Sequence, residues 1–243
     1  MPGTASGTAP GARYVREMFG RIAPRYDLLN HLLSFQTDRW WRWRVARRFR
    51  SLLARPEARA LDLCCGTGDL ALALARQAHS SASIVGADFC HPMLERARAK
   101  MGAAGRAARL AEADALYLPF GDGSFDLVAA AFGFRNLADY HAGLSEIFRV
   151  LAPGGSVAIL EFCEPGAGVF GRLYDVYFRK LLPRIGGVIS GDSSAYRYLG
   201  SSVREFPSPA RLAEWMAQAG FSEVKYARFT GGIACLHSGT RPG

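Results

Sequence analysis

The sequence predicts an α/β fold, in which helices cover both faces of a mostly parallel sheet of seven strands. The main observation is an alternation of short apolar runs, which suit buried strands, with stretches that have helical spacing. A second is the glycine turn Gly66–Gly68, which stands where an apolar run stops and an alanine- and leucine-rich stretch begins. At 243 residues, the chain is long enough for one such domain with appended helices and too short for two.

The first half of the domain contains four predicted strands. Phe125–Ala131 is uninterrupted enough to be buried on both faces of the sheet. Pro92 suits the first turn of a helix, because the N–H that proline lacks has no partner there. The expected elements are strand Ala60–Leu63, helix Leu70–Ala78, strand Ser83–Asp88, helix Pro92–Arg98, a third strand ending near Glu112–Ala115, and strand Phe125–Ala131.

The second half departs once from this alternation. Residues 166–207 form an insertion rich in apolar and aromatic side chains, and its position before the last helix suits a roof over a site for an apolar substrate. Core packing is the alternative for part of it. The other expected elements are helix Tyr140–Val150, turn Gly154–Gly155, strand Ser156–Glu161, helix Pro209–Ala219 and a closing hairpin of Phe221–Phe229 and Ile233–Ser238.

The N-terminal region precedes the sheet. A helix is expected over Val15–Ala23, ended by Pro24. Tyr26 and the following residues to His31 are predicted either to lie across the mouth of the site or to tie this region to the domain by hydrogen bonds. The predicted boundaries are a flexible tail over 1–12 and a single domain over 13–243, with a helical cap over 13–56 and the insertion over 166–207.

The segment Arg39–Arg50 alternates arginines with three tryptophans in a predicted helix. Indole rings and guanidinium groups suit the headgroup region of an anionic bilayer. They suit RNA almost as well, through stacking and phosphate contacts. A third interpretation is a packed helix whose tryptophans cover an edge of the sheet. The sequence leaves all three open.

Composition restricts the location of the protein. A net charge of +9 predicts attraction to anionic surfaces. No apolar run approaches the roughly 18 residues of a membrane span. Residues 1–12 lack the basic start and apolar core of an export signal, so we expect a cytoplasmic protein. Contact with the inner face of the membrane through Arg39–Arg50 is one of the interpretations left open above. The 5 cysteines have neither zinc spacing nor a disulfide pattern, and no metal is expected.

The glycine turn formally matches a dinucleotide-binding fingerprint. Asp69 argues against a dinucleotide, because a carboxylate at the start of the helix would repel a pyrophosphate. A cationic ligand is favoured. S-adenosylmethionine carries an ammonium and a sulfonium, for which Asp62 and Asp69 are suitable partners. The alternative is that Asp69 only caps the helix. Such a turn also presents free backbone N–H groups to a ligand.

Two further carboxylates fit the same ligand. Asp88 ends the second strand and can accept hydrogen bonds from both hydroxyls of a ribose. Asp114 lies near the end of the third strand and can accept a hydrogen bond from an adenine amino group. Acids placed for an ammonium, a ribose and an adenine favour an adenosyl sulfonium.

Longer motifs accompany these acids. They are Met18-Phe19-x-x-Ile22-Ala23-x-x-Tyr26-Asp27-x-x-Asn30, Phe132-Gly133-Phe134-Arg135-Asn136, Glu161-Phe162-Cys163-Glu164-Pro165, Tyr196-x-Tyr198-Leu199-x-Ser201-Ser202-Val203-x-x-Phe206-Pro207 and Thr230-Gly231-Gly232-Ile233-Ala234-x-x-His237-x-Gly239. With them, the chain resembles class I S-adenosylmethionine-dependent methyltransferases, and more narrowly the C-methyltransferases of menaquinone and ubiquinone biosynthesis. The resemblance runs from about Val15 to Gly239.

The resemblance implies a Rossmann-like domain that binds S-adenosylmethionine. The cofactor-binding residues it implies are Asp62, Gly66, Thr67, Gly68, Asp69, Asp88, Asp114, Ala115 and Ala131. One departure is Gln36, which stands where the family's pattern has glycine and puts the local loop shape in question.

The resemblance also implies a substrate, a quinol with a polyprenyl tail that is methylated at a ring carbon. The first choice is 2-demethylmenaquinol; a quinol of the ubiquinone pathway or another lipid or aromatic small molecule is the alternative. A ring carbon is a poor nucleophile until a neighbouring hydroxyl ionises. Arg135, with Asn136, is implied to act here, because a guanidinium stays protonated and stabilises an oxyanion. Tyr26, His31 or a water held by Asn136 would relay the proton.

Other partners fit the sequence less well. The loop Phe132–Asn136 lacks the Asn/Asp-Pro-Pro-Tyr motif of many nucleic-acid N-methyltransferases, which disfavours nucleic acid as a partner. An RNA-binding module on a vestigial methyltransferase fold would use Arg39–Arg50, but the intact acids argue against it. The formation of a homo-oligomer stays open.

Overall fold

At the core of the molecule is a sheet in which five strands run parallel. After each of these strands, a crossover connection returns the chain to the end of the sheet where the strand began. The computed structural model describes residues 12–106, 109–163 and 193–243. The strands are β1 Arg59–Leu63, β2 Ser83–Asp88, β3 Arg109–Glu112, β4 Phe125–Ala131, β5 Leu151–Phe162, β6 Ser222–Phe229 and β7 Ala234–Thr240. Their order is β3-β2-β1-β4-β5-β7-β6, and β7 pairs antiparallel with β5 and β6. The predicted mostly parallel seven-stranded sheet is confirmed.

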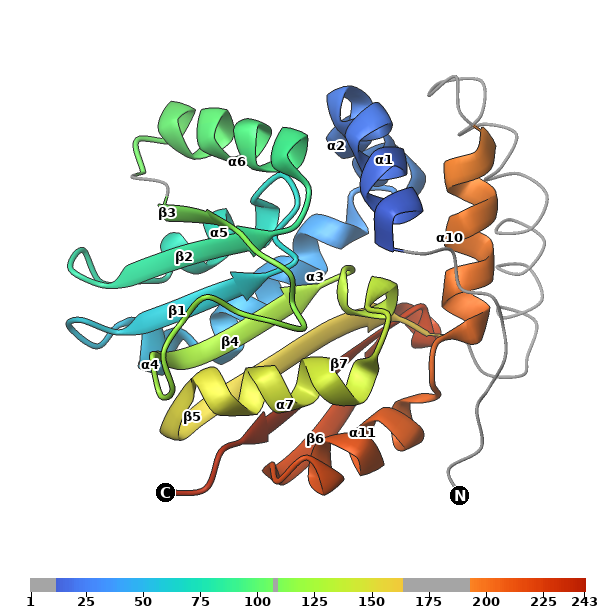
Figure 1. Cartoon of the computed structure of the whole chain (residues 1–243). Helices are drawn as coiled ribbons and strands as arrows, with labels where there is room; N and C mark the ends of the chain where they lie inside the picture. The colour runs from blue at the N-terminus through green and yellow to red at the C-terminus, as the bar shows by residue number, and fades with distance from the viewer. Residues whose placement is uncertain (1–11, 107–108, 164–192) are drawn as a thin grey trace.

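Helices cover both faces of this sheet (Figure 1), because alternate residues of a strand point to opposite sides. In β1, Ala60 belongs to one buried hydrophobic cluster and Leu61 to another. The first cluster contains Trp41 of α3, and the second contains Leu144 of α7. The helices of the domain are α3 Thr37–Arg48, α4 Arg50–Leu53, α5 Asp69–Ala75, α6 His91–Ala103, α7 Tyr140–Val150 and α11 Pro209–Gln218.

Further helices gather beyond the carboxyl ends of the parallel strands (Figure 1). Helix α1 contacts both α6 and α10, so segments that are far apart in the sequence meet here. The elements are α1 Ala12–Ile22, the 3-10 turn Ala23–Arg25, α2 Tyr26–Leu33 and α10 Ser193–Glu205. The predicted N-terminal helical cap is therefore present. None of the helices in the described ranges has the length and apolar character needed to cross a membrane.

The structure corrects several predicted boundaries. The predicted basic aromatic helix consists of two helices, α3 and α4, because the helical conformation is interrupted at Phe49. Helix α5 stops at Ala75, three residues early, and β5 begins at Leu151, so it includes Gly154 and Gly155. A register shift between β4 and β5 accommodates this longer strand. Of the predicted tail, 1–11 lie outside the described residues, as do 166–192 of the predicted insertion.

Candidate active site

A pocket opens at the carboxyl ends of β1, β2 and β4, where open α/β sheets bind ligands. Its empty volume, including space open to solvent, is ≈ 980 Å³. Of the predicted site residues, those that line it are Tyr26, Asp62, Gly66, Thr67, Asp69, Asp88, Asp114, Ala115, Ala131 and Asn136. Gly68 and Arg135 lie outside the lining.

The glycine turn has the backbone shape that the sequence predicts. Gly66 and Gly68 have φ of +53° and +83°, values that residues with a side chain rarely adopt. A Cβ on Gly68 would lie 3.1 Å from Cβ of Ala97, so α6 also requires glycine here. The prediction that these N–H groups are free was wrong. The N–H of Gly66 donates to Asp88 and that of Gly68 to the carbonyl of Cys65.

The neighbouring strand ends are also strained. Cys64 after β1 and Phe132 after β4 both have positive φ, 54° and 62°. A Cβ on Gly133 would lie only 2.3 Å from Cβ of Cys64, so the two turns can approach this closely only with glycine at 133. Strain of this kind collects where a site has to be held in one shape.

Asp62 carries an unsatisfied acceptor beside the pocket. Its Oδ2 accepts a 2.7 Å hydrogen bond from the N–H of Ala71, while Oδ1 is buried and has no partner among the described residues. Burial raises the pKa of Asp62 to about 8. A cation that entered the pocket would satisfy Oδ1 and favour the charged form.

Asp88 holds the turn together. Its Oδ2 accepts a 2.8 Å bond from the N–H of Gly66, and its Oδ1 a 2.9 Å bond from the N–H of Cys90. Burial raises the pKa of Asp88 to about 6, although these backbone donors work in the opposite direction. Each carboxylate oxygen still has a second lone pair for a ligand. Asp114, by contrast, is exposed and accepts from the N–H of Leu116.

Helix α2 covers the turn, and both sequence interpretations of this segment are found. The ring of Tyr26 lies over Gly66, within 4.0 Å of where a Cβ would stand. Burial raises the pKa of the Tyr26 hydroxyl. At the same time, the hydroxyl of Thr67 donates to Asp27, which ties α2 to the turn.

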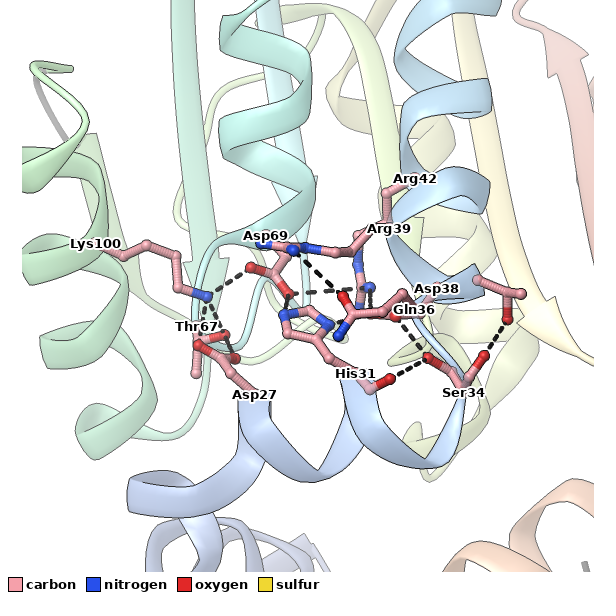
Figure 2. A network of polar contacts seen from close by, with 11 residues as sticks. Asp27, His31, Ser34, Gln36, Asp38, Arg39, Arg42, Thr67, Asp69 and Lys100 are labelled. Atoms are coloured by element: carbon pink, nitrogen blue, oxygen red, sulfur yellow. Dashed lines mark hydrogen bonds and ion pairs between the residues drawn. The ribbon is translucent and has the colours of Figure 1, made fainter.

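Lys100 of α6 fastens this arrangement from the other side (Figure 2). Its Nζ lies 2.6 Å from Oδ2 of Asp27 and 2.6 Å from Oδ1 of Asp69, and it donates to the hydroxyl of Thr67 at 3.0 Å. One ammonium therefore joins three elements: the helix over the turn, the turn itself and α6.

Basic side chains also lie beside the other oxygen of Asp69 (Figure 2). Its Oδ2 lies 3.6 Å from Nε2 of His31 and 3.9 Å from Nη1 of Arg42. Burial alone would raise the pKa of Asp69, but Arg42 and Lys100 outweigh it and the pKa is lowered. Asp38, on α3, pairs with Arg42 at 2.5 Å and with Nδ1 of His31 at 2.8 Å. The charge that was predicted for a ligand ammonium is thus already matched within the protein.

Arg135 is buried behind the pocket wall. Its Nη1 lies 3.0 Å from Oε2 of Glu161 and donates to the carbonyl of Phe132. Its backbone N–H donates to Glu161 at 3.0 Å, while its Nε has no partner among the described residues. The pair holds the turn that carries Asn136, whose Oδ1 accepts a 3.0 Å hydrogen bond from the hydroxyl of Tyr198.

Several residues of the site escaped sequence reasoning. Lys100 stands about thirty positions beyond the turn, and the one available signal is that lysine is rare in this chain. Glu161 and Tyr198 belong to motifs quoted above, but nothing in those motifs assigns them a partner. Arg42 stands four residues after Asp38, the spacing of a helical ion pair, within a segment whose many arginines conceal it.

The structure shows one of the three predicted roles of the basic aromatic segment, packing against the sheet. Trp41 is buried, contacts Phe132 and donates its indole N–H to the hydroxyl of Thr230. Trp40 and Trp43 are exposed, each beside an arginine side chain. The packed interpretation therefore holds for Trp41, while two tryptophans stay available to a partner.

The sheet order and the helices on both faces define a class of fold, the Rossmann-like α/β domains. A solved structure from Thermotoga maritima, described as an S-adenosylmethionine-dependent methyltransferase and possible histamine N-methyltransferase, superposes with a TM-score of 0.62 at 20% identity, covering 93% of this chain and 98% of that one. At this identity the match shows the fold alone. It agrees with the predicted Rossmann-like architecture.

The sequence comparisons are more specific. The model of the ubiE/COQ5 methyltransferase family matches residues 8–241, and the chain belongs to this family. A demethylmenaquinone methyltransferase from Thermus thermophilus is 55% identical over 93% of this chain and 100% of the relative. A ubiquinone/menaquinone biosynthesis C-methyltransferase from Geobacter sp. is 47% identical over 93% of this chain and 96% of the relative. The protein is therefore a methyltransferase, as the sequence predicted.

Proposed function

We propose that this enzyme transfers a methyl group from S-adenosylmethionine to a ring carbon of a polyprenylated quinol, most specifically 2-demethylmenaquinol. The observation that carries the proposal is the unpartnered Oδ1 of Asp62, a buried acceptor on a residue that lines a pocket of ligand size. The choice of quinol is supported by the names of relatives at 55% and 47% identity.

The residues present fit the cofactor. Asp62 would receive its ammonium, since that acceptor lacks any other partner among the described residues. Asp88 would receive the ribose, and Asp114, with Ala115, would lie against the adenine. Gly66 leaves room beneath Tyr26. When bound, S-adenosylmethionine supplies an electrophilic methyl group next to a sulfonium; the protein contributes position and the exclusion of water.

Tyr26 and Asn136 both line the pocket, and we assign them to the methyl-transfer step. Because burial raises the pKa of Tyr26, its phenol stays protonated near neutral pH and donates a hydrogen bond to a developing quinol oxyanion. Asn136 is held by the hydroxyl of Tyr198 and can position a hydroxyl or a water. Arg135, which lies behind the wall, acts as a positioning residue whose charge favours negative charge nearby.

The test is a turnover assay with a demethylmenaquinone analogue, with and without a chemical reductant. Only the reduced form should be methylated, because only a ring hydroxyl can ionise and activate the carbon. Equal turnover of the oxidised form would refute the mechanism. Mass spectrometry of quinones that accumulate in a deletion strain identifies the ring, and a benzoquinone precursor would favour the ubiquinone pathway instead.

We further propose that the enzyme works in the cytoplasm at the inner face of the membrane, where a polyprenyl quinol resides. The exposed side of α3 supports this, because Trp40 and Trp43 stand beside Arg44 and Arg47. Vesicle binding by a Trp40→Ser/Trp43→Ser variant tests this contact.

A further inference from the structure

Helix α2 turns polar side chains toward the domain. Asp27 contacts Lys100 and Thr67 of the domain, and His31 lies between Asp38 and Asp69 (Figure 2). A surface helix normally packs its apolar side on the core. Among the described side chains of α2, Asp27 and His31 take the place on the domain side that apolar side chains usually occupy.

The opposite side of α2 is apolar and faces outward. Leu28 and Leu32, one helical turn apart, are 61% and 48% exposed. Phe35, in the turn that follows, is 75% exposed, and its N–H donates to the carbonyl of Leu32. Scattered apolar side chains on a surface are ordinary, but three aligned on one short segment mark an interaction surface.

The backbone around Phe35 is held in an unusual shape. Phe35 and Gln36 have φ of 50° and 63°, in the left-handed region that favours glycine. The N–H of Gln36 donates to the carbonyl of His31 at 2.8 Å, which fixes the turn to the end of α2. The strained turn therefore fixes the position of Phe35 on this surface.

Charge narrows the kind of partner. Across residues 28–56, which the structure describes without a gap, Asp38 is the sole acidic residue and it is buried. Arg25 precedes α2 and Arg39 begins α3, and both are exposed. An apolar centre with cations at its ends and no exposed carboxylate complements an anionic lipid surface.

We propose that Leu28, Leu32 and Phe35, the outer face of α2, insert into an anionic lipid bilayer. Because the inner face of α2 covers the pocket, this contact would turn the pocket mouth toward the membrane. The role in substrate delivery rests on the proposed function, since only a polyprenyl quinol has to be received from a bilayer. Lipid binding itself does not depend on the reaction.

The test is flotation of the full chain with vesicles of phosphatidylglycerol and phosphatidylcholine, compared with phosphatidylcholine alone. Leu28→Ser/Leu32→Ser/Phe35→Ser should lower binding to the anionic vesicles at least about tenfold, because three buried apolar side chains are lost. The matched control is Tyr117→Ser/Tyr226→Ser, which removes aromatics that are 80% and 45% exposed elsewhere and should bind like the wild type.

Three outcomes would overturn the proposal: wild-type binding by the triple variant, equal loss in the tyrosine control, or loss confined to Trp40→Ser/Trp43→Ser, which would make α3 the docking surface. Circular dichroism checks that each variant is folded. Turnover separates docking from chemistry. The triple variant should keep wild-type turnover of a short-chain, water-soluble quinol and lose that of a polyprenyl quinol in vesicles. If the wild type methylates neither quinol, the proposed function fails while the vesicle result stands.

Discussion

The pocket is bounded by two regions that treat carboxylates in opposite ways. On the sheet side, Asp62 and Asp88 are buried among backbone donors, and burial raises their pKa values to about 8 and about 6. On the side of the cap, Asp38 and Asp69 are also partly desolvated, but neighbouring cations lower their pKa values. The difference shows that the sheet side keeps an unpartnered acceptor for a ligand, Oδ1 of Asp62, whereas the acids between the cap and the domain serve to attach the cap.

The largest effect should come from the buried ion pair on the sheet side. Arg135→Met leaves Glu161 buried and unpaired, which should lower the free energy of unfolding by about 3–5 kcal/mol. The control is Arg13→Met, because the Arg13–Glu17 pair is exposed and should contribute less than about 1 kcal/mol. Urea unfolding measures both. Equal losses would show that burial of the Arg135 pair is energetically unimportant.

The next effect separates binding from stability. Asp62→Asn should weaken S-adenosylmethionine binding by about 1.5–3 kcal/mol, the range for a lost charged hydrogen bond. It should not lower stability at pH 8, because the wild type has there a buried, partly ionised carboxyl whose Oδ1 has no partner among the described residues. Asp69→Asn is the comparison and should affect stability more than affinity. Calorimetry measures the affinity and urea unfolding the stability. If Asp69→Asn mainly lowered affinity and Asp62→Asn mainly lowered stability, the roles assigned to the two carboxylates would be wrong.

The pH dependence of binding sharpens the same comparison. The ammonium of S-adenosylmethionine favours the charged form of Asp62, whose pKa without ligand is about 8. The affinity should therefore rise between pH 6 and 8, because Asp62 has already lost its proton in a growing fraction of the molecules. Stability without ligand should change in the opposite direction. Between pH 4 and 8 the Asp62 carboxyl holds its proton in the folded state and has lost it in the unfolded chain, so its contribution to the free energy of unfolding falls as pH rises. Calorimetry from pH 6 to 9 should show a flatter profile for Asp62→Asn.

A smaller effect on stability is expected where the cap contacts α6. Lys100→Met removes the cation shared by Asp27 and Asp69 and should lower stability by about 1 kcal/mol, since the site is partly exposed. Asp69 has a lowered pKa, so its contribution is present above the unfolded value of 3.8 and is lost as pH falls through the folded pKa. The variant should therefore lose less stability on acidification. Lys225→Met, at an exposed position, should match the wild type at every pH.

The smallest effect concerns the turn after α2. Gln36→Gly should raise the free energy of unfolding by about 0.5 kcal/mol, because φ is 63° and glycine adopts this value without strain. Gln77→Gly, where φ is not positive, should be destabilising instead. A loss of stability in both variants would show that the Gln36 contact with Arg39 outweighs the backbone strain.

Local pattern alone determined much of this protein. Alternating apolar runs and a glycine turn sufficed for the sheet and for Asp62 and Asp88 near the pocket, because parallel strands end at one edge and bring their last residues together. Asn136 followed from the family resemblance. Tertiary structure alone decided which charges are matched. Lys100 and Asp69 meet only when α6 packs against the glycine turn, and Arg135 loses solvent only when β5 brings Glu161 beside it. Desolvation and ion pairing depend on neighbours distant in sequence, so a residue's type and spacing cannot reveal whether its charge stays free for a ligand.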